Sequence, residues 1–141
     1  MSSEMRSVEI HIPSEYGYEK VAMASVAAVA RRMGFSADRI DDLKTAVAEA
    51  CLNALEHGNR LDISTKVVVV MTVQPEGLEV NVTDEGKQPI PERFPQPGDK
   101  LGERHRGIFI IQSLMDKVEF SSIPTGGNQI RMVIHLNKPS A

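Results

Sequence analysis

A carboxylate and a carboxamide that can take part in chemistry lie four residues apart, at Glu49 and Asn53. At about 100° per residue, a helix would place these two side chains about 40° apart on one face. Glu49 can accept a proton and Asn53 can offer a neutral oxygen to a hard cation, and both functions suit phosphoryl transfer. The spacing alone leaves open that the two groups are simply solvated. The opposite side of the helix carries an apolar row made by Ile40, Leu43, Val47, Cys51 and Ala54.

A second carboxylate, Asp84, ends an alternating segment at residues 78–84. Alternation along a strand puts Asp84 on the face of the apolar residues, so its side chain points towards the core and needs a partner there. Such an acceptor at the bottom of a pocket suits an exocyclic amine such as that of adenine. Gly86 would let the backbone approach a flat ring closely. The alternative is that the pleat ends early and Asp84 only caps the turn.

Asn128 and a basic segment at residues 102–107 are further candidates for a binding site. Asn128 lies in phase with the apolar residues of the last alternating segment and is expected to face inward, unless it is only a turn residue. Arg104, His105 and Arg106 precede Gly107 at a predicted helix N-terminus, where free N–H groups attract phosphate. A solvated basic turn is the alternative for this segment.

The elements that position these groups are predicted from periodicity and capping residues. Ser14 predicts the cap of a helix that runs to Met33, and Ser36 predicts the cap of a second helix that runs to His57. A third helix is expected from about Gly107. Residues 85–103 contain four prolines and three glycines and predict a long irregular loop. Strands are predicted at residues 8–12, 66–73, 78–84, 117–123 and 128–136.

This order of elements predicts an α+β fold, a two-layer sandwich with three helices on one face of a mostly antiparallel sheet. A length of 141 residues fits a single domain over residues 1–141. A net charge of -3 argues against direct binding of nucleic acid through phosphate contacts. The single cysteine favours a reducing compartment, and the chain shows no signal peptide or membrane span. We therefore expect a cytoplasmic protein, without a zinc site because its four histidines are scattered.

Taken together, these motifs resemble those of the GHKL ATPase superfamily, which shares the Bergerat or histidine-kinase-like ATPase fold. The matching motifs are Glu-Ala-x-x-Asn-Ala-x-x-His-Gly at residues 49–58, Asp-Glu-Gly at 84–86 and Arg-Gly-Ile at 106–108. The chain resembles the small stand-alone serine kinases that act as anti-sigma factors, the RsbW/SpoIIAB type. The resemblance covers nearly the whole chain.

The resemblance implies a role for each motif residue. Glu49 would be the catalytic base, and Asn53 would be the ligand of the Mg²⁺ ion that bridges the phosphates of ATP. Asp84 would bind the adenine amine, with Gly86 shaping the ring pocket. An ATP lid is expected at about residues 87–106. The other expected nucleotide-binding residues are His57, Arg104, Arg106, Gly107, Ile108 and Asn128.

The resemblance also implies partners. The expected substrate is a serine of a small STAS-domain anti-anti-sigma protein, and the second expected partner is a sigma factor. Sequestering the sigma factor would block transcription, and phosphorylating the antagonist would keep it blocked. Members of this family are commonly homodimers, so a homodimer is expected here, with no membrane partner.

Four residues differ from the family pattern. His105 and Arg106 stand where the second glycine box usually offers a further glycine, Gln88 replaces a glycine of the first box, and Asn128 stands where relatives often carry threonine. The two cations can compensate by pairing with phosphate, or they can mark a degraded nucleotide site. The alternative to a kinase is therefore a binding module that sequesters a regulator without phosphoryl transfer. A third interpretation, an ATPase domain detached from a sensor kinase, lacks a segment that would deliver a phosphohistidine.

Overall fold

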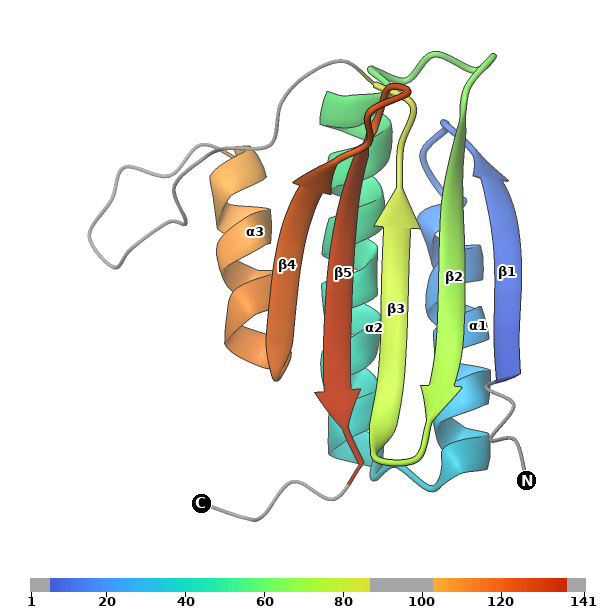
Figure 1. Cartoon of the computed structure of the whole chain (residues 1–141), viewed down its shortest axis with the longest axis vertical. Coiled ribbons are helices and arrows are strands. Elements are labelled where there is room, and N and C mark those ends of the chain that lie inside the picture. The colour runs from blue at the N-terminus through green and yellow to red at the C-terminus, as the bar shows by residue number, and fades with distance from the viewer. Residues whose placement is uncertain (1–5, 87–102, 137–141) are drawn as a thin grey trace.

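The computed structural model describes residues 6–86 and 103–136, which form a sheet covered by helices (Figure 1). The strands are β1 (Arg6–Pro13), β2 (Lys66–Gln74), β3 (Gly77–Thr83), β4 (Lys117–Ser122) and β5 (Asn128–His135). The helices are α1 (Glu19–Met33), α2 (Ala37–Asn53) with the π-helical turn η1 (Ala54–Gly58), and α3 (Glu103–Leu114). The predicted order of elements is confirmed.

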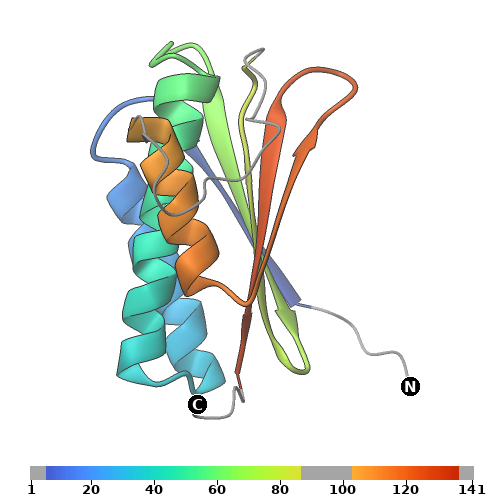
Figure 2. The ribbon, with the colours of Figure 1, turned by 90° about the vertical axis from the view of Figure 1, so that its left-hand side faces the viewer.

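The sheet has the strand order β1-β2-β3-β5-β4, and every neighbouring pair is antiparallel. Figure 2 shows α1, α2 and α3 packed on one face of this sheet, so the predicted two-layer α+β sandwich is confirmed. The central strand β3 lies between β2 and β5, which places the end of β3 beside the start of β5. This pairing brings Asp84 and Asn128 together, although they are far apart in the sequence.

The core lies between the two layers and follows the predicted alternation. In β2 the odd-numbered residues Val67, Val69 and Met71 are buried, and in β3 the even-numbered residues Leu78, Val80 and Val82 are buried. The apolar row of α2 packs against them, since Leu43, Val47 and Cys51 are fully buried. Burying this row turns the opposite side of α2, with Glu49, towards α3.

The start of α1 differs from the prediction. The helix begins at Glu19, and its N-cap residue, Tyr18, makes no side-chain capping hydrogen bond. Ser14 is instead buried, where its hydroxyl donates to the Thr65 carbonyl oxygen at 3.1 Å and receives a hydrogen bond from Asn59 Nδ2 at 2.9 Å. The Ser14 hydroxyl therefore makes tertiary hydrogen bonds and does not form the cap of α1 that the sequence predicts.

The predicted cap of the second helix is confirmed. Ser36 has an extended backbone, and its side chain accepts a hydrogen bond from the backbone N–H of Arg39 at 3.3 Å. The helical segment continues to Gly58, but its last turn is a π-helix in which the Asn59 N–H donates to the Ala54 carbonyl oxygen at 2.8 Å. This wider turn inserts one extra residue and sets the positions of His57 and Gly58.

The third helix begins at Glu103, four residues before the predicted start at Gly107. Gly107 therefore lies in the second turn of α3 and not at its N-terminus. Residues 103–106 belong to α3 and not to the predicted lid, because the helical backbone already includes them. The rest of the predicted lid, residues 87–102, lies outside the described residues.

Arg39 connects the two helices that form the site. From the first turn of α2 its guanidinium pairs with Asp116 at 3.0 Å and donates to the Leu114 carbonyl oxygen, at the end of α3, at 3.3 Å. The same Asp116 oxygen accepts the backbone N–H of His135 at 2.7 Å. These charge-assisted bonds hold α3 against both α2 and the sheet.

Cys51 is expected to be unreactive in the folded protein. Burial raises the pKa of its thiol from 9.0 to about 12, and the nearby charge of Glu19 adds to the rise. Because the thiolate is the reactive form, a thiol reagent at about pH 8 should label the protein only after unfolding. The unfolded chain loses this proton at lower pH than the folded one, so this thiol's contribution to stability falls as pH rises from 9.0 to about 12. Absorbance-monitored labelling of folded and unfolded samples checks the prediction, and rapid labelling of the folded protein would contradict it.

Candidate active site

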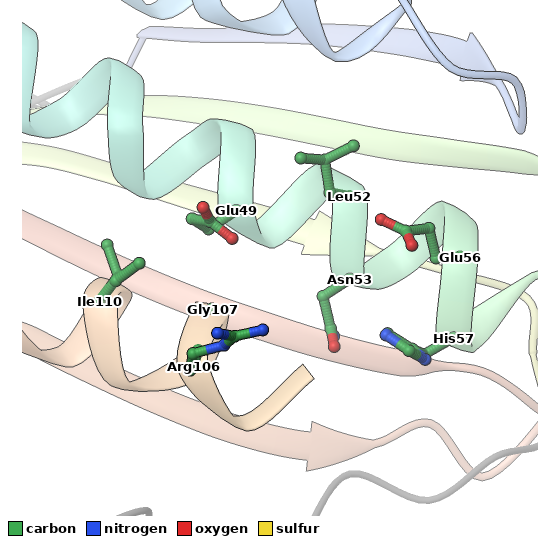
Figure 3. A pocket seen from close by; sticks show the side chains of 8 residues that line it. All are labelled: Glu49, Leu52, Asn53, Glu56, His57, Arg106, Gly107 and Ile110. Atoms are coloured by element: carbon green, nitrogen blue, oxygen red, sulfur yellow. The ribbon is translucent and has the colours of Figure 1, made fainter. Parts of the chain in front are cut away.

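A cavity of about 240 Å³ lies between α2 and α3, and several of the predicted site residues line it. Glu49, Leu52, Asn53, Glu56 and His57 line it from the α2–η1 segment, and Arg106, Gly107 and Ile110 line it from α3 (Figure 3). The two polar residues of the opening motif therefore share one cavity, as their 40° separation on a helix suggests.

Gly107 leaves room for the Glu49 carboxylate. A Cβ atom on Gly107 would lie 2.8 Å from Glu49 Oε2, so the flexible end of this side chain would have to shift to make room for it. The half-buried Glu49 carboxylate therefore lies directly beside the Gly107 backbone. Gly107 thus contacts the predicted base, whereas the sequence predicted that it would mark the helix N-terminus.

Asn53, His57 and Arg106 give the cavity groups suited to an anion and a hard cation. Asn53 is only 5% exposed, and in Figure 3 its amide points towards the space beside the start of α3. His57 follows one turn later on the same side, and Arg106 presents a cation from the facing helix. An amide oxygen is a ligand for Mg²⁺, and a guanidinium pairs well with phosphate.

Asp84 lies next to this cavity in a hydrogen-bonded cluster and does not line it. The residue is only 5% exposed, so the predicted inward orientation is confirmed. Asp84 Oδ1 accepts the backbone N–H groups of Gly86 at 2.9 Å and Asn128 at 3.1 Å, and the Asp84 N–H donates to the Asn128 carbonyl oxygen at 2.9 Å. The carboxylate therefore both faces inward and stabilises the turn, which combines the two interpretations that the sequence left open. Asn128 is also buried, at the first position of β5.

Glycines surround Asp84 on several sides. A Cβ atom on Gly58 would overlap the Asp84 carboxylate, and one on Gly86 would overlap the Gly58 carbonyl group. A Cβ atom on Gly127, whose φ is 108°, would likewise overlap the Asp84 carbonyl oxygen. Gly58 follows His57 directly, so the packing of Gly58 on Asp84 joins the cluster to the cavity. The missing side chains let these backbone segments pack directly on Asp84 and on one another.

Asn59 is a positioning residue whose partners were not predicted from the sequence. It is 5% exposed, and its Oδ1 accepts the Glu85 N–H at 2.7 Å. Its Nδ2 donates to Ser14 Oγ at 2.9 Å and to the Lys66 carbonyl oxygen at 3.1 Å. Asn59 thereby ties the end of η1 to the residue after Asp84. Asn59 directly follows the motif at residues 49–58, but its partners Ser14, Lys66 and Glu85 are distant in sequence.

The remaining predicted residues are placed differently. Ile108 is 1% exposed and packs in the interior without lining the cavity. The side chain of Arg104 lies outside the described residues, as does Gln88. Among residues 6–86 and 103–136, no group of three or more histidine, cysteine, aspartate or glutamate side chains is arranged to hold a metal ion. A magnesium ion that keeps water and phosphate ligands needs only one or two protein oxygens, so Asn53 fits that chemistry.

Comparisons with known proteins agree with this geometry. The family model described as "Histidine kinase-like ATPase domain" matches residues 12–134. The chain is 34% identical to the serine-protein kinase RsbW of Bacillus velezensis over 97% of this chain and 90% of that protein. The chain belongs to the RsbW family of serine-protein kinases. The RsbW of Bacillus subtilis (strain 168) is 32% identical with the same coverage, and an RsbW of Bacillus cereus is 30% identical over 84% of this chain and 79% of that protein.

A solved structure confirms the fold of the family in this chain. The crystal structure of the RsbU and RsbW domains of a Mycobacterium tuberculosis protein matches with a TM-score of 0.70 and 18% identity. The match covers 96% of this chain and 34% of that one, so this chain corresponds to about a third of the solved chain. The histidine-kinase-like ATPase fold predicted from the motifs is thereby confirmed. In the part of the chain that the structure describes, every helix is too short or too polar to cross a membrane.

Proposed function

We propose that this protein transfers the γ-phosphoryl group of ATP to a serine of a STAS-domain anti-anti-sigma protein and sequesters a sigma factor. The observation that carries the proposal is that Glu49, Asn53, Arg106 and Gly107 line the same cavity, beside the buried Asp84 cluster. Membership of the RsbW family supports the protein-serine kinase activity and the anti-sigma role.

Glu49 is the proposed catalytic base. It accepts the proton of the serine hydroxyl while the serine oxygen forms its bond to the γ-phosphorus and the bond from that phosphorus to the ADP oxygen breaks. Its half-buried carboxylate lies beside Gly107 and lines the cavity, which supports this role. Arg106 is placed to pair with phosphate charge from the opposite side of the cavity.

Asn53 is the proposed ligand of Mg²⁺, with the phosphates of ATP and water completing the coordination. The ion, when bound, neutralises phosphate charge. Asp84 is the proposed acceptor for the adenine amine, and Gly58, Gly86 and Gly127 form the backbone surface around it. His57 and Gly58 then lie between the phosphate region and the adenine region, since His57 lines the cavity and Gly58 packs on Asp84.

The proposed partners are the STAS-domain protein, the sigma factor and a second copy of this chain, with the cytoplasm as the proposed location. The test is incubation with Mg²⁺, radiolabelled ATP and the STAS-domain protein encoded nearest to this chain, followed by mass-spectrometric mapping of the product. One phosphoserine on the STAS-domain protein is the expected result. Transfer to histidine, or none in the presence of bound ATP, would overturn the proposed reaction.

A binding module without transfer is the second candidate, and Arg106 favours it, since its side chain lines the cavity where the family pattern has glycine. Calorimetric titration with Mg-ATP separates the two candidates. Saturable binding is expected for the kinase, whereas an absence of binding together with tight capture of a sigma factor would favour the module.

A further inference from the structure

A second, larger cavity of about 530 Å³ lies at the end of the molecule opposite the Asp84 cluster. It is a groove, and its lining residues come from the last turns of α1 and from the start of β1 and the ends of β2 and β5. Figures 1 and 2 show that these segments lie at the same end of the molecule. Its size falls in the range of about 300–1,000 Å³ that small-molecule sites occupy. Nothing in the proposed kinase reaction uses it.

The walls of the groove are apolar because α1 leaves this end of β1 uncovered. Along the helix-facing side of β1, Ile12 is 2% exposed but Val8 is 43% exposed. No part of α1 covers Val8, so its side chain is exposed and lines the groove. The other apolar lining residues come from α1 and from the strand ends, and they are Val29, Met33, Val73 and Leu136.

Of the described residues that line the groove, only two arginines are charged. Arg6 enters it from β1 and Arg32 from the last turn of α1, and none of these lining residues is a carboxylate. Within residues 6–86 and 103–136, neither arginine forms an ion pair. An apolar trough with two cations matches a molecule with a hydrocarbon body and one anionic head, since a guanidinium binds carboxylate through paired hydrogen bonds.

We infer that this groove binds an aliphatic monocarboxylate, with the hydrocarbon chain against Val8, Val29 and Met33 and the carboxylate on Arg6 and Arg32. A neutral chain of the same length would leave the arginines without a partner and would bind more weakly. An inorganic anion would leave the apolar walls hydrated. The inference is independent of the kinase reaction, because the two cavities share no residue.

Methyl NMR with decanoate as the probe tests the inference. Titration of the full chain below the micelle concentration should shift the methyl signals of Val8, Val29 and Met33 and leave that of Ile110, in the other cavity, unchanged. Arg32→Gln should weaken decanoate binding about tenfold, as expected for a lost hydrogen bond between charged groups. Arg31→Gln is the matched control, because Arg31 is exposed in the same turn and does not line the groove. Decanol should bind clearly more weakly than decanoate.

Several results would overturn the inference. One is that decanoate shifts none of these signals. Another is that decanol shifts them as much as decanoate does. A third is that decanoate binds equally well to Arg32→Gln and Arg31→Gln. Shifts that depend on protein concentration without ligand would assign the groove to a second copy of the chain. Shifts produced by deleting residues 137–141 without ligand would assign it to the chain's own end, which follows the lining residue Leu136.

Discussion

Glu49→Gln is expected to reduce phosphoryl transfer by at least about 100-fold while ATP binding is retained, because a positioned general base typically contributes about 10²–10⁴ in rate. Glutamine keeps the size of the side chain and its place beside Gly107 but cannot accept the proton. Single-turnover transfer to the STAS-domain protein measures the rate, and calorimetry measures ATP affinity in the same preparation.

Glu56→Gln is the matched control for Glu49→Gln. Glu56 lines the same cavity and the substitution removes the same charge, but no role in proton transfer is assigned to it. Transfer should therefore stay close to the wild-type rate in this variant. A wild-type rate in Glu49→Gln, or an equal loss in both variants, would show that Glu49 is not the base.

Asp84→Asn is expected to weaken ATP binding by about 10- to 100-fold, which corresponds to a lost hydrogen bond to a charged group of about 1.5–3 kcal/mol. The amide oxygen of asparagine can still accept the N–H groups of Gly86 and Asn128, so the turn should persist. The NH₂ group of asparagine, however, would face the adenine amine. Both groups are hydrogen-bond donors, so no hydrogen bond would form between them. Binding of ATP and of GTP is measured by calorimetry, and the preference for ATP should narrow, because guanine carries a carbonyl oxygen where adenine carries the amine.

Glu85→Gln is the control for this second prediction. Glu85 is the next residue, is exposed, and accepts the Lys66 N–H at 2.6 Å. The Glu85→Gln variant should bind ATP nearly as well as the wild type and should keep the same preference for ATP over GTP. If Asp84→Asn loses affinity for both nucleotides equally, the carboxylate is structural only.

The parts of the fold that were predictable depend on local periodicity. Alternation in β2 and β3 identified which side chains are buried, and Ser36 identified the start of α2, because these features involve residues close in sequence. The inward orientation of Asp84 came from the same alternation, extended by one residue past the strand.

The errors arose where distant residues decide the structure. Ser14 has the chemistry of a cap, but Thr65 and Asn59 compete for its hydroxyl, and a sequence does not show that competition. The π-helical turn at η1 has no periodic pattern because it is a single turn. The early start of α3 at Glu103 was missed, since Gly107 was interpreted as a helix boundary although it makes space for Glu49.

The sequence predicted which residues gather at the site, but it predicted their arrangement only in part. The spacing of Glu49 and Asn53 predicted a shared face, and the structure places both in one cavity. The spacing did not predict that Asp84 would lie beside the cavity, joined to it through Gly58, because that arrangement depends on how η1 meets the end of β3. The roles of these residues in binding and transfer remain predictions.

A crystal structure with Mg²⁺ and a non-hydrolysable ATP analogue tests most directly whether one nucleotide joins the two regions. We expect the adenine amine on the Asp84 carboxylate, the metal ion on the Asn53 amide oxygen, and the γ-phosphate beside Glu49 and Arg106. An analogue bound elsewhere, or bound with its adenine ring or its metal ion away from these side chains, would contradict the account.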